Sequence, residues 1–355
     1  MTQDAIPQAQ AFERTRTGPD TWLPVLYIAL GVALISALLW SMVSGRYQVP
    51  FGHVVAILAA HVVDLTPSWT PTVLIVVEVV RLPRVLTAAI AGAGLSLCGA
   101  VLQGLFRNPL VGPQTIGVSS GAALGGVTAI LFFGFDNFVQ IGAFVGAAAA
   151  LLAVLAIHRS DSLSPILTLV LAGVVVSAFC GALVGLATYV ADPETKLPDI
   201  VFWLLGSFAS ATWPKLSLLS VCTAVAGVVL LGMRWRINVL SLGDEDARSL
   251  GVNPARDRVI LLTATCLAIS AQVAVSGTIG WVGLVIPNLA RLMVGADHRR
   301  LLPVSTLMGA VFLVVADTLA RDLTAAEIPV GIVTAIVGTP VFAYLLRRNT
   351  SSKTS

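Results

Sequence analysis

Apolar runs of about 20 residues recur along the whole chain, and they constrain its fold more than any other feature. An α-helix of that length crosses the roughly 30 Å of hydrocarbon in a bilayer. With 57% hydrophobic and 11% charged residues, the 355-residue chain has too little polar surface for a water-soluble globule. The runs are too long for the alternating pattern of an outer-membrane barrel. The sequence therefore predicts an all-α, polytopic transmembrane helical bundle.

Charged residues and Pro/Gly breaks divide the apolar sequence into ten predicted spans. The spans are 22–44, 82–106, 114–134, 138–157, 165–190, 213–233, 257–276, 279–295, 303–321 and 328–346. We expect one transmembrane domain over 22–347, with tails at 1–21 and 348–355. The eighth span is the least regular, because Gly280, Gly283 and Pro287 interrupt it. Such breaks are expected where backbone is buried in protein or lines a cavity.

The positions of lysine and arginine predict the orientation of the chain. With a cytoplasmic N-terminus, fifteen of the 21 basic residues fall on the inside. The six on the outside are Arg46, Arg81, Arg84, Lys196, Lys215 and Arg321. This excess of inner positive charge predicts that both termini, and both tails, are cytoplasmic.

The inner segment 234–258 is the only sizeable charged stretch between two predicted spans. Leu240, Ala247 and Leu250 give it a weak apolar face, and Asp244 to Asp246 form an acidic run. A solvated connector explains this pattern adequately. The alternative is a docking helix for a cytosolic partner.

The fifth span carries a small residue at every fourth position: Gly173, Ser177, Gly181 and Gly185. Close helix packing is the more common use of such a stripe. On a pore-facing surface, the same residues would leave room for a large solute.

Ionisable residues are almost absent from the span interiors. Asp317 is the deepest, and Arg321 one turn later explains it as an i,i+4 ion pair. A proton- or sodium-coupled transporter usually shows a midplane carboxylate or a polar unwound site, so this sequence does not favour an ion-coupled transporter. None of the lysines follows a glycine, which excludes the nucleotide-binding loop GxxxxGK[ST]. Active transport would thus require a separate ATPase that uses ATP and Mg²⁺.

No cofactor, metal site or catalytic cluster is expected in this chain. The four cysteines each stand alone in an apolar span, which is typical of small core residues. Nucleic acid is not an expected partner, whereas the lipid bilayer is.

Three outer arginines, Arg81, Arg84 and Arg321, go against the charge bias, and each lies at the end of a predicted helix. Arginine suits bidentate pairing with carboxylates, so an acidic soluble partner could dock on them. Snorkelling to lipid headgroups is the alternative.

Seven motifs, in order along the chain, resemble those of the FecCD-type permeases, which import ferric siderophores, haem and cobalamin. They are RLPR at 81–84, GAVLQGLFRNPL at 99–110, IGVSSGA at 116–122, LGDEDARSLG at 242–251, GTIGWVGLVIP at 277–287, GADHRRLLP at 295–303 and EIPVGIVT at 327–334. The resemblance covers about 22–347.

This resemblance implies a type II ABC importer in a bacterial inner membrane. Its other parts would be a second permease copy, identical or related, two cytosolic ABC ATPases, and a periplasmic or lipoprotein substrate-binding protein. The coupling helices that contact the ATPase would be 240–251, with the residues Leu242, Gly243, Asp244, Glu245, Asp246, Ala247, Arg248, Ser249, Leu250 and Gly251.

The resemblance also implies roles outside the coupling segment. It assigns docking of the binding protein to Arg81, Arg84 and Arg321, the cytoplasmic gate to Asn108 and Leu110, and the pathway to the Gly173, Ser177, Gly181 and Gly185 stripe.

Two departures from the family pattern bear on these roles. Asn288 stands where many relatives have histidine, so we expect no ionisable group there. The stretch 111–116 differs from the form common in haem and cobalamin permeases. We therefore expect an iron chelate, in particular a ferric siderophore, as cargo. Haem or cobalamin import, or an ATP-independent secondary transporter, is the alternative.

Overall fold

The computed structural model describes residues 22–64, 66, 68–134, 138–158, 165–324 and 326–351. In order, its helices are α2 (Trp22–Val43), α3 (Phe51–Ala59), α4 (Pro71–Ile75), the π-helical η1 (Val76–Arg81), α5 (Leu82–Leu105), α6 (Val118–Phe133), α7 (Phe138–Ile157), α8 (Pro165–Val190), α9 (Lys196–Leu204), α10 (Trp213–Gly232), α11 (Arg234–Leu242), α12 (Asp244–Ser249), α13 (Pro254–Ser276), α14 (Val282–Val294), α15 (His298–Asp322) and α16 (Val330–Ser351). The predicted tail 1–21 and the last residues of the tail 348–355 lie outside the described part.

Eight helices in the described part are long and apolar enough to cross a membrane, which makes this a multi-pass membrane protein. They are α2, the continuous helix from α4 to α5, α7, α8, α10, α13, α15 and α16. Two further apolar helices, α6 and α14, are shorter. Each predicted span coincides with one of these ten helices. Ten full crossings stay a prediction, because α6 and α14 are too short to cross on length alone.

The second predicted span begins much earlier than residue 82. α4, η1 and α5 form one helix of 35 residues, from Pro71 to Leu105. Thr70 caps its start by accepting a hydrogen bond from the Val73 amide. A helix of this length extends over about 50 Å, well beyond the hydrocarbon thickness. Glu78 and Arg81 interrupt the apolar run and conceal this extension from a hydropathy argument.

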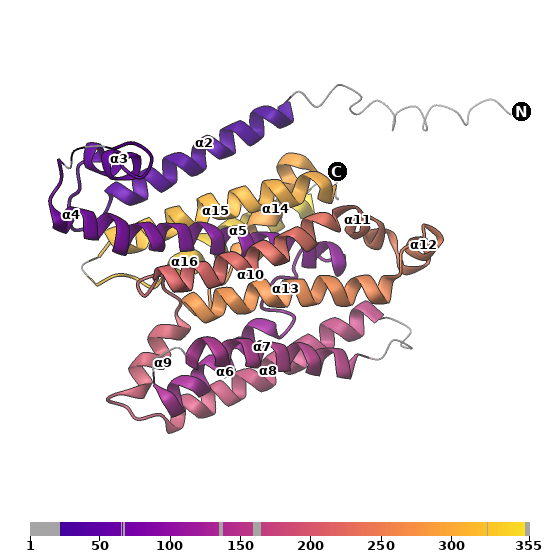
Figure 1. Cartoon of the computed structure of the whole chain (residues 1–355). Helices are drawn as coiled ribbons and strands as arrows, with labels where there is room; N and C mark the ends of the chain where they lie inside the picture. Colours follow the sequence, from indigo (N-terminus) through magenta and orange to yellow (C-terminus); the bar gives the residue numbers. More distant parts are fainter. Residues whose placement is uncertain are drawn as a thin grey trace, which may run out of the picture.

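The long helices run side by side, and the connecting elements gather at two opposite ends (Figure 1). α11 and α12 lie at one end, here called the inner end, and α3, α4 and α9 lie at the other, the outer end. α2 begins and α16 ends towards the inner end. Which compartment each end faces stays a prediction.

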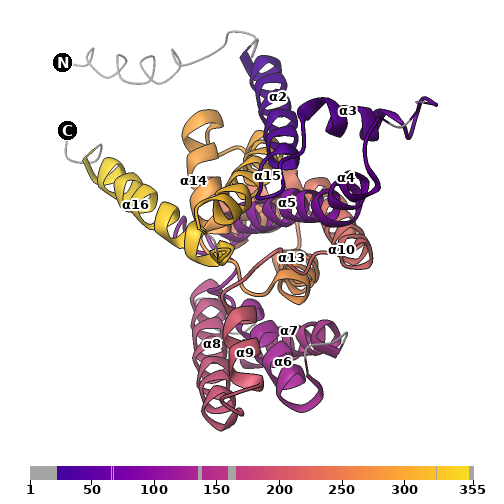
Figure 2. The same cartoon turned by 90° about the vertical axis from the view of Figure 1, so that its left-hand side faces the viewer.

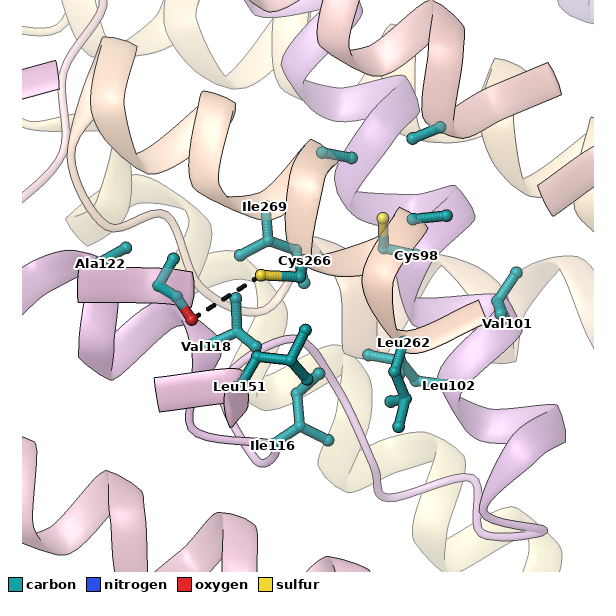
Figure 3. Close-up of a cluster of buried hydrophobic side chains, with 14 of the residues drawn as sticks. Cys98, Val101, Leu102, Ile116, Val118, Ala122, Leu151, Leu262, Cys266 and Ile269 are labelled. Atoms are coloured by element: carbon teal, nitrogen blue, oxygen red, sulfur yellow. Dashed lines mark hydrogen bonds between the residues drawn. The ribbon is translucent and has the colours of Figure 1, made fainter. Parts of the chain in front are cut away.

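α13 stands between two groups of helices. Viewed from the outer end, α6, α7, α8 and α9 form one group, and α2, α5, α10, α14, α15 and α16 form the other (Figure 2). α13 contacts α6 and α7 on one side and α5 and α10 on the other. Figure 3 shows the apolar side chains at this junction, including Leu102 of α5, Leu262 of α13 and Leu151 of α7. Their burial joins the two groups.

Glycines allow the closest helix crossings. A Cβ added to Gly92 of α5 would overlap the carbonyl of Gly309 on α15, and one on Gly99 would overlap the carbonyl of Gly283 on α14. Small residues at such crossings let two backbones touch, which strengthens packing where lipid offers no hydrophobic driving force. α5 is thereby fixed against both α14 and α15.

Candidate transport pathway and coupling surface

The predicted coupling segment forms two short helices at the inner end rather than one. α11 ends at Leu242, and Gly243 turns the chain with a φ of 145° before α12 begins. A residue with a side chain rarely adopts that φ, so glycine is required at the turn. Gly251, with a φ of 78°, makes a second turn before α13.

Most side chains of the predicted coupling residues are accessible. Glu245, Asp246 and Arg248 are exposed, and Ala247 is fully buried. Leu250 was expected on the apolar face with Leu240 and Ala247, but it is 52% exposed. The expectation is wrong because α12 ends at Ser249, so Leu250 no longer follows the helical periodicity. An exposed charged surface with two exposed leucines, Leu242 and Leu250, results.

Asp244, the first residue of α12, fastens the segment to the helical bundle. Its carboxylate accepts hydrogen bonds from both terminal nitrogens of Arg258 on α13, one at 2.8 Å. The same carboxylate pairs with Arg107 at 3.3 Å. The hydrogen bonds from Arg258 lower the pKa of Asp244 below its ordinary value. Sequence reasoning missed both arginine partners, because they lie 14 and 137 positions away.

The predicted gate residues lie in the turn that follows α5. The Asn108 side chain accepts a hydrogen bond from the Leu110 amide at 2.9 Å, which holds the turn in shape. Leu110 is 48% exposed. Arg107, which directly precedes this turn, pairs with Asp244 of the predicted coupling segment. The structure therefore joins the predicted gate to the predicted coupling segment.

α14 also holds this turn. Asn288 donates hydrogen bonds to the carbonyls of Pro109 and Leu284, at 2.9 and 2.8 Å. Arg291 bonds to the side-chain oxygens of Asn288 and Gln103, each at 2.8 Å. Asn288 therefore holds the predicted gate turn through its amide. The sequence indicated only that an asparagine replaces the histidine of many relatives, and it did not indicate the bond to the Pro109 carbonyl.

A second polar cluster ties α11 to α15. The Asn238 carbonyl oxygen accepts from the His298 backbone amide at 2.9 Å and lies 2.7 Å from His298 Nδ1. The Asn238 amide donates to Asp297, the N-cap of α15. Only the adjacency of Asp297 and His298 was visible in the sequence.

The stripe on α8 divides into two parts. Gly173 packs against the backbone of Thr115 and Ile116, and Ser177 donates to the carbonyl of Gln114 at 3.3 Å. Nothing lies within 4 Å of a Cβ placed on Gly181 or Gly185. The first half of the stripe therefore serves packing, whereas the second half faces open space. Whether a solute passes there stays a prediction.

Two cavities differ in size and position. One of about 140 Å³ lies between Leu110, Gln114 and Thr115 on one side and residues 279–284 on the other. A larger one of about 550 Å³ lies near the outer end, lined by α9, Ser207, Ala209 and Ser210, and the end of α13. Trp281, at the small cavity, has a φ of 68°, which a bulky residue rarely adopts. Both cavities have mixed apolar and polar walls without a charged cluster.

The three outer arginines are buried and have internal partners. Arg84 binds Asp317 through Nε and Nη2, at 2.9 to 3.2 Å, and Glu327 through Nη1 at 2.8 Å. Arg321 bonds to the carbonyl and hydroxyl of Ser41 at 3.0 and 2.7 Å. Its Nε lies 3.5 Å from Asp317, which confirms the predicted i,i+4 pair.

Arg81 is buried without a carboxylate partner among the hydrogen bonds of the described residues. It donates to the backbone carbonyls of Met42, Val43 and Tyr47. All three arginines are at most 7% exposed, so neither snorkelling nor a free docking surface describes them in this conformation. Docking after a change in conformation stays a prediction.

No group of three or more metal-binding side chains occurs among the described residues. The four cysteines are free, and three of them, Cys98, Cys180 and Cys266, are buried.

Comparison with known proteins agrees with the helical architecture and the motifs. Residues 33–348 match the model of the FecCD transport family. The chain is 42% identical to the molybdate import system permease protein of Haemophilus influenzae, over 92% of this chain and 96% of that one. It is also 42% identical to the hemin transport system permease protein of Yersinia pestis, over 76% of this chain and 82% of the other.

A solved structure, described as an inward-facing conformation of an ABC transporter of the metal-chelate type, has the same fold. It is 41% identical, with a TM-score of 0.82, and the match covers 92% of this chain and 99% of that one.

Proposed function

Because this chain belongs to the FecCD transport family, we propose that it is the membrane-spanning permease of an ATP-driven importer in a bacterial inner membrane. The observation that carries the proposal is the joining of an exposed, charged surface, α11–α12, to the turn that holds Asn108 and Leu110. A surface of this kind suits a cytosolic partner, and the turn suits a gate. Ten crossings and cytoplasmic termini belong to the same proposal.

The importer requires further subunits. A cytosolic ATPase pair would bind α11–α12 and supply ATP hydrolysis, since the chain has no lysine-containing nucleotide loop. A second permease copy would complete the pathway, since α8 leaves Gly181 and Gly185 open on one side. A periplasmic or lipoprotein binding protein would deliver the cargo at the outer end.

Transport then proceeds by alternating access. ATP-driven movement of the ATPases shifts α11–α12, and the gate turn opens or closes the inner end of the path. Cargo contacts within the permease are weak, because the cavity walls carry no charged cluster. Weak contacts favour release, and the binding protein provides the affinity.

Arg84 could bind a carboxylate of the binding protein only if Asp317 or Glu327 released it. Glu327 is the exchangeable one, since its side chain is 38% exposed whereas that of Asp317 is 1% exposed. A carboxylate of the binding protein would replace Glu327 on Arg84. Displacement of Glu327 would free the segment between α15 and α16. Arg81 and Arg321 would contact the partner only after this segment has moved.

A ferric siderophore is the proposed cargo, in keeping with the residues at 111–116. Molybdate is a second candidate, because a relative named for molybdate import matches nearly the whole chain at 42% identity. The two differ greatly in size and charge. The open surface at Gly181 and Gly185 favours the larger chelate.

Uptake into liposomes tests the proposal and the cargo together. The vesicles carry this chain, its ATPase and its binding protein, and each component is omitted in turn. Ferric siderophore, haem, cobalamin, ferric citrate and molybdate are offered separately. We expect uptake of a ferric siderophore that needs all three components. Uptake of another cargo alone would correct the substrate, and uptake without the ATPase would contradict the importer.

A further inference from the structure

Arg107 occupies a backbone position that normally belongs to glycine. At the end of α5, the Asn108 amide bonds to the Gln103 carbonyl and the Arg107 amide to the Gly104 carbonyl, at 3.1 and 3.3 Å. This pattern is the Schellman helix ending, in which the residue at the position of Arg107 is left-handed and usually glycine. Arg107 has a φ of 51°, and Trp281 is the only other non-glycine residue with positive φ in the described part. An arginine here is strained where glycine would be relaxed.

The side chain of Arg107 makes a contact that glycine could not make. It reaches Asp244 at the start of α12, with 3.3 Å between Nη2 and Oδ1. The pair is partly exposed, so it adds little to the stability of the fold. The pair matters because of its position: it is a direct side-chain contact between α12 and the residue that precedes the predicted gate turn.

The two ends of this contact are held in different ways. Asp244 is fixed by the fork of Arg258, whose side chain is 8% exposed. Arg107 precedes Asn108, and the Pro109 carbonyl is bound by Asn288 on α14. A displacement of α12 therefore moves Arg107, and Arg107 moves the turn that carries Leu110. α14 follows through Asn288.

We propose that Arg107 is a positioning residue that transmits the movement of α11–α12 to the inner gate through Asp244. This inference rests on the proposed function, and it assigns to Arg107 a part in coupling ATP hydrolysis in a partner to transport. Arg107 contacts neither nucleotide nor cargo in this role.

The test compares Arg107→Gly with the unchanged chain in liposomes that contain the ATPase and binding protein. Glycine removes the side chain and also relieves the left-handed strain, so the variant should fold at least as well. We expect ATP hydrolysis close to that of the unchanged complex and a fall of about tenfold in cargo imported per ATP, within the usual range of coupling effects. Arg107→Lys keeps the charge and should recover most of the loss.

Arg256→Ala serves as the control, because Arg256 is also an exposed arginine near the inner end and its side chain has no ion pair with any of the described residues. It should leave import per ATP unchanged. A second readout is the rate at which a thiol reagent modifies Leu110→Cys. That rate should change with nucleotide when Arg107 is present and stay constant in Arg107→Gly.

Three outcomes would overturn the proposal. The first is unchanged import per ATP in Arg107→Gly. The second is a parallel fall in hydrolysis and import, which would mean that Arg107 serves assembly alone. Equal losses in Arg107→Gly and Arg107→Lys would exclude the ion pair. If the unchanged complex imports no cargo, the proposed function fails first, and this result is recognised without any variant.

Discussion

The outer and inner ends of this molecule both carry charge, but they use it differently. At the outer end, the Arg84 side chain is 8% exposed and binds two carboxylates of the same chain. At the inner end, α12 presents Glu245, Asp246 and Arg248 to solvent. A charged side chain at a helix end therefore indicates a binding surface only if that side chain is exposed.

Energetics explain why the two ends behave differently. A buried ion pair contributes little net stability, yet removal of one member leaves an uncompensated charge and is strongly destabilising. Exposed charges cost almost nothing to change. Substitutions at the outer end should therefore affect folding, whereas those at the inner end should affect assembly.

The largest effect is expected from Arg84→Ala. It leaves Asp317 and Glu327 without their shared guanidinium, and the fully buried Asp317 then keeps only the longer contact with Arg321, at 3.5 Å. We expect a loss of about 3–5 kcal/mol in the free energy of unfolding. Arg84→Lys keeps the charge but loses the fork, so it should lose less. Thermal unfolding in detergent measures both variants. An Arg84→Ala protein that is as stable as the unchanged chain but fails to bind its partner would contradict a stabilising role for the outer arginines.

A smaller effect on stability, with a large effect on assembly, is expected from Asp246→Lys on α12. The side chain is exposed, so the free energy of unfolding should change by no more than about 0.5 kcal/mol. Binding of the ATPase should be lost, which co-purification would show. Glu194→Lys, an exposed acidic residue towards the outer end, is the matched control and should keep the ATPase. Retained binding in Asp246→Lys would remove α12 from the coupling surface.

The smallest effect concerns pH at the inner end. Because its folded-state pKa is lowered, Asp244 contributes stability that is complete above its unfolded-state pKa. That contribution is lost only as the pH falls through the lowered folded-state pKa. Cargo imported per ATP should therefore show no step between pH 8 and pH 6, a range well above any carboxyl of this kind. A step in that range that disappears in Asp244→Asn would contradict the assignment.

Much of the fold follows from hydropathy. The runs at 138–157 and 165–190 coincide with α7 and α8, because loops with charged or Pro/Gly residues bound them clearly. The helix from Pro71 to Leu105 was misjudged at its start, because Glu78 and Arg81 resemble a span boundary. Hydropathy cannot show that a charged residue is buried by protein rather than exposed at a membrane edge.

The candidate site was predictable only where its parts lie close in sequence. The charged segment 234–258 and the Asp317–Arg321 pair were visible as local patterns, whereas the Asn108 turn and the bounds 240–251 came from the family resemblance. The pairing of Arg107 with Asp244 joins positions 137 residues apart. Nor does a sequence show that Arg107 is left-handed, since arginine is rare in that conformation.

The source of energy for uptake distinguishes an ATP-driven importer from a secondary transporter. Liposomes with this chain, its ATPase and its binding protein are loaded with ATP, with a non-hydrolysable analogue, or with ATP and a proton uncoupler. We expect that cargo enters with ATP, that the analogue abolishes entry, and that the uncoupler has no effect. Entry that persists without ATP and collapses with the uncoupler would contradict the importer and indicate a secondary transporter.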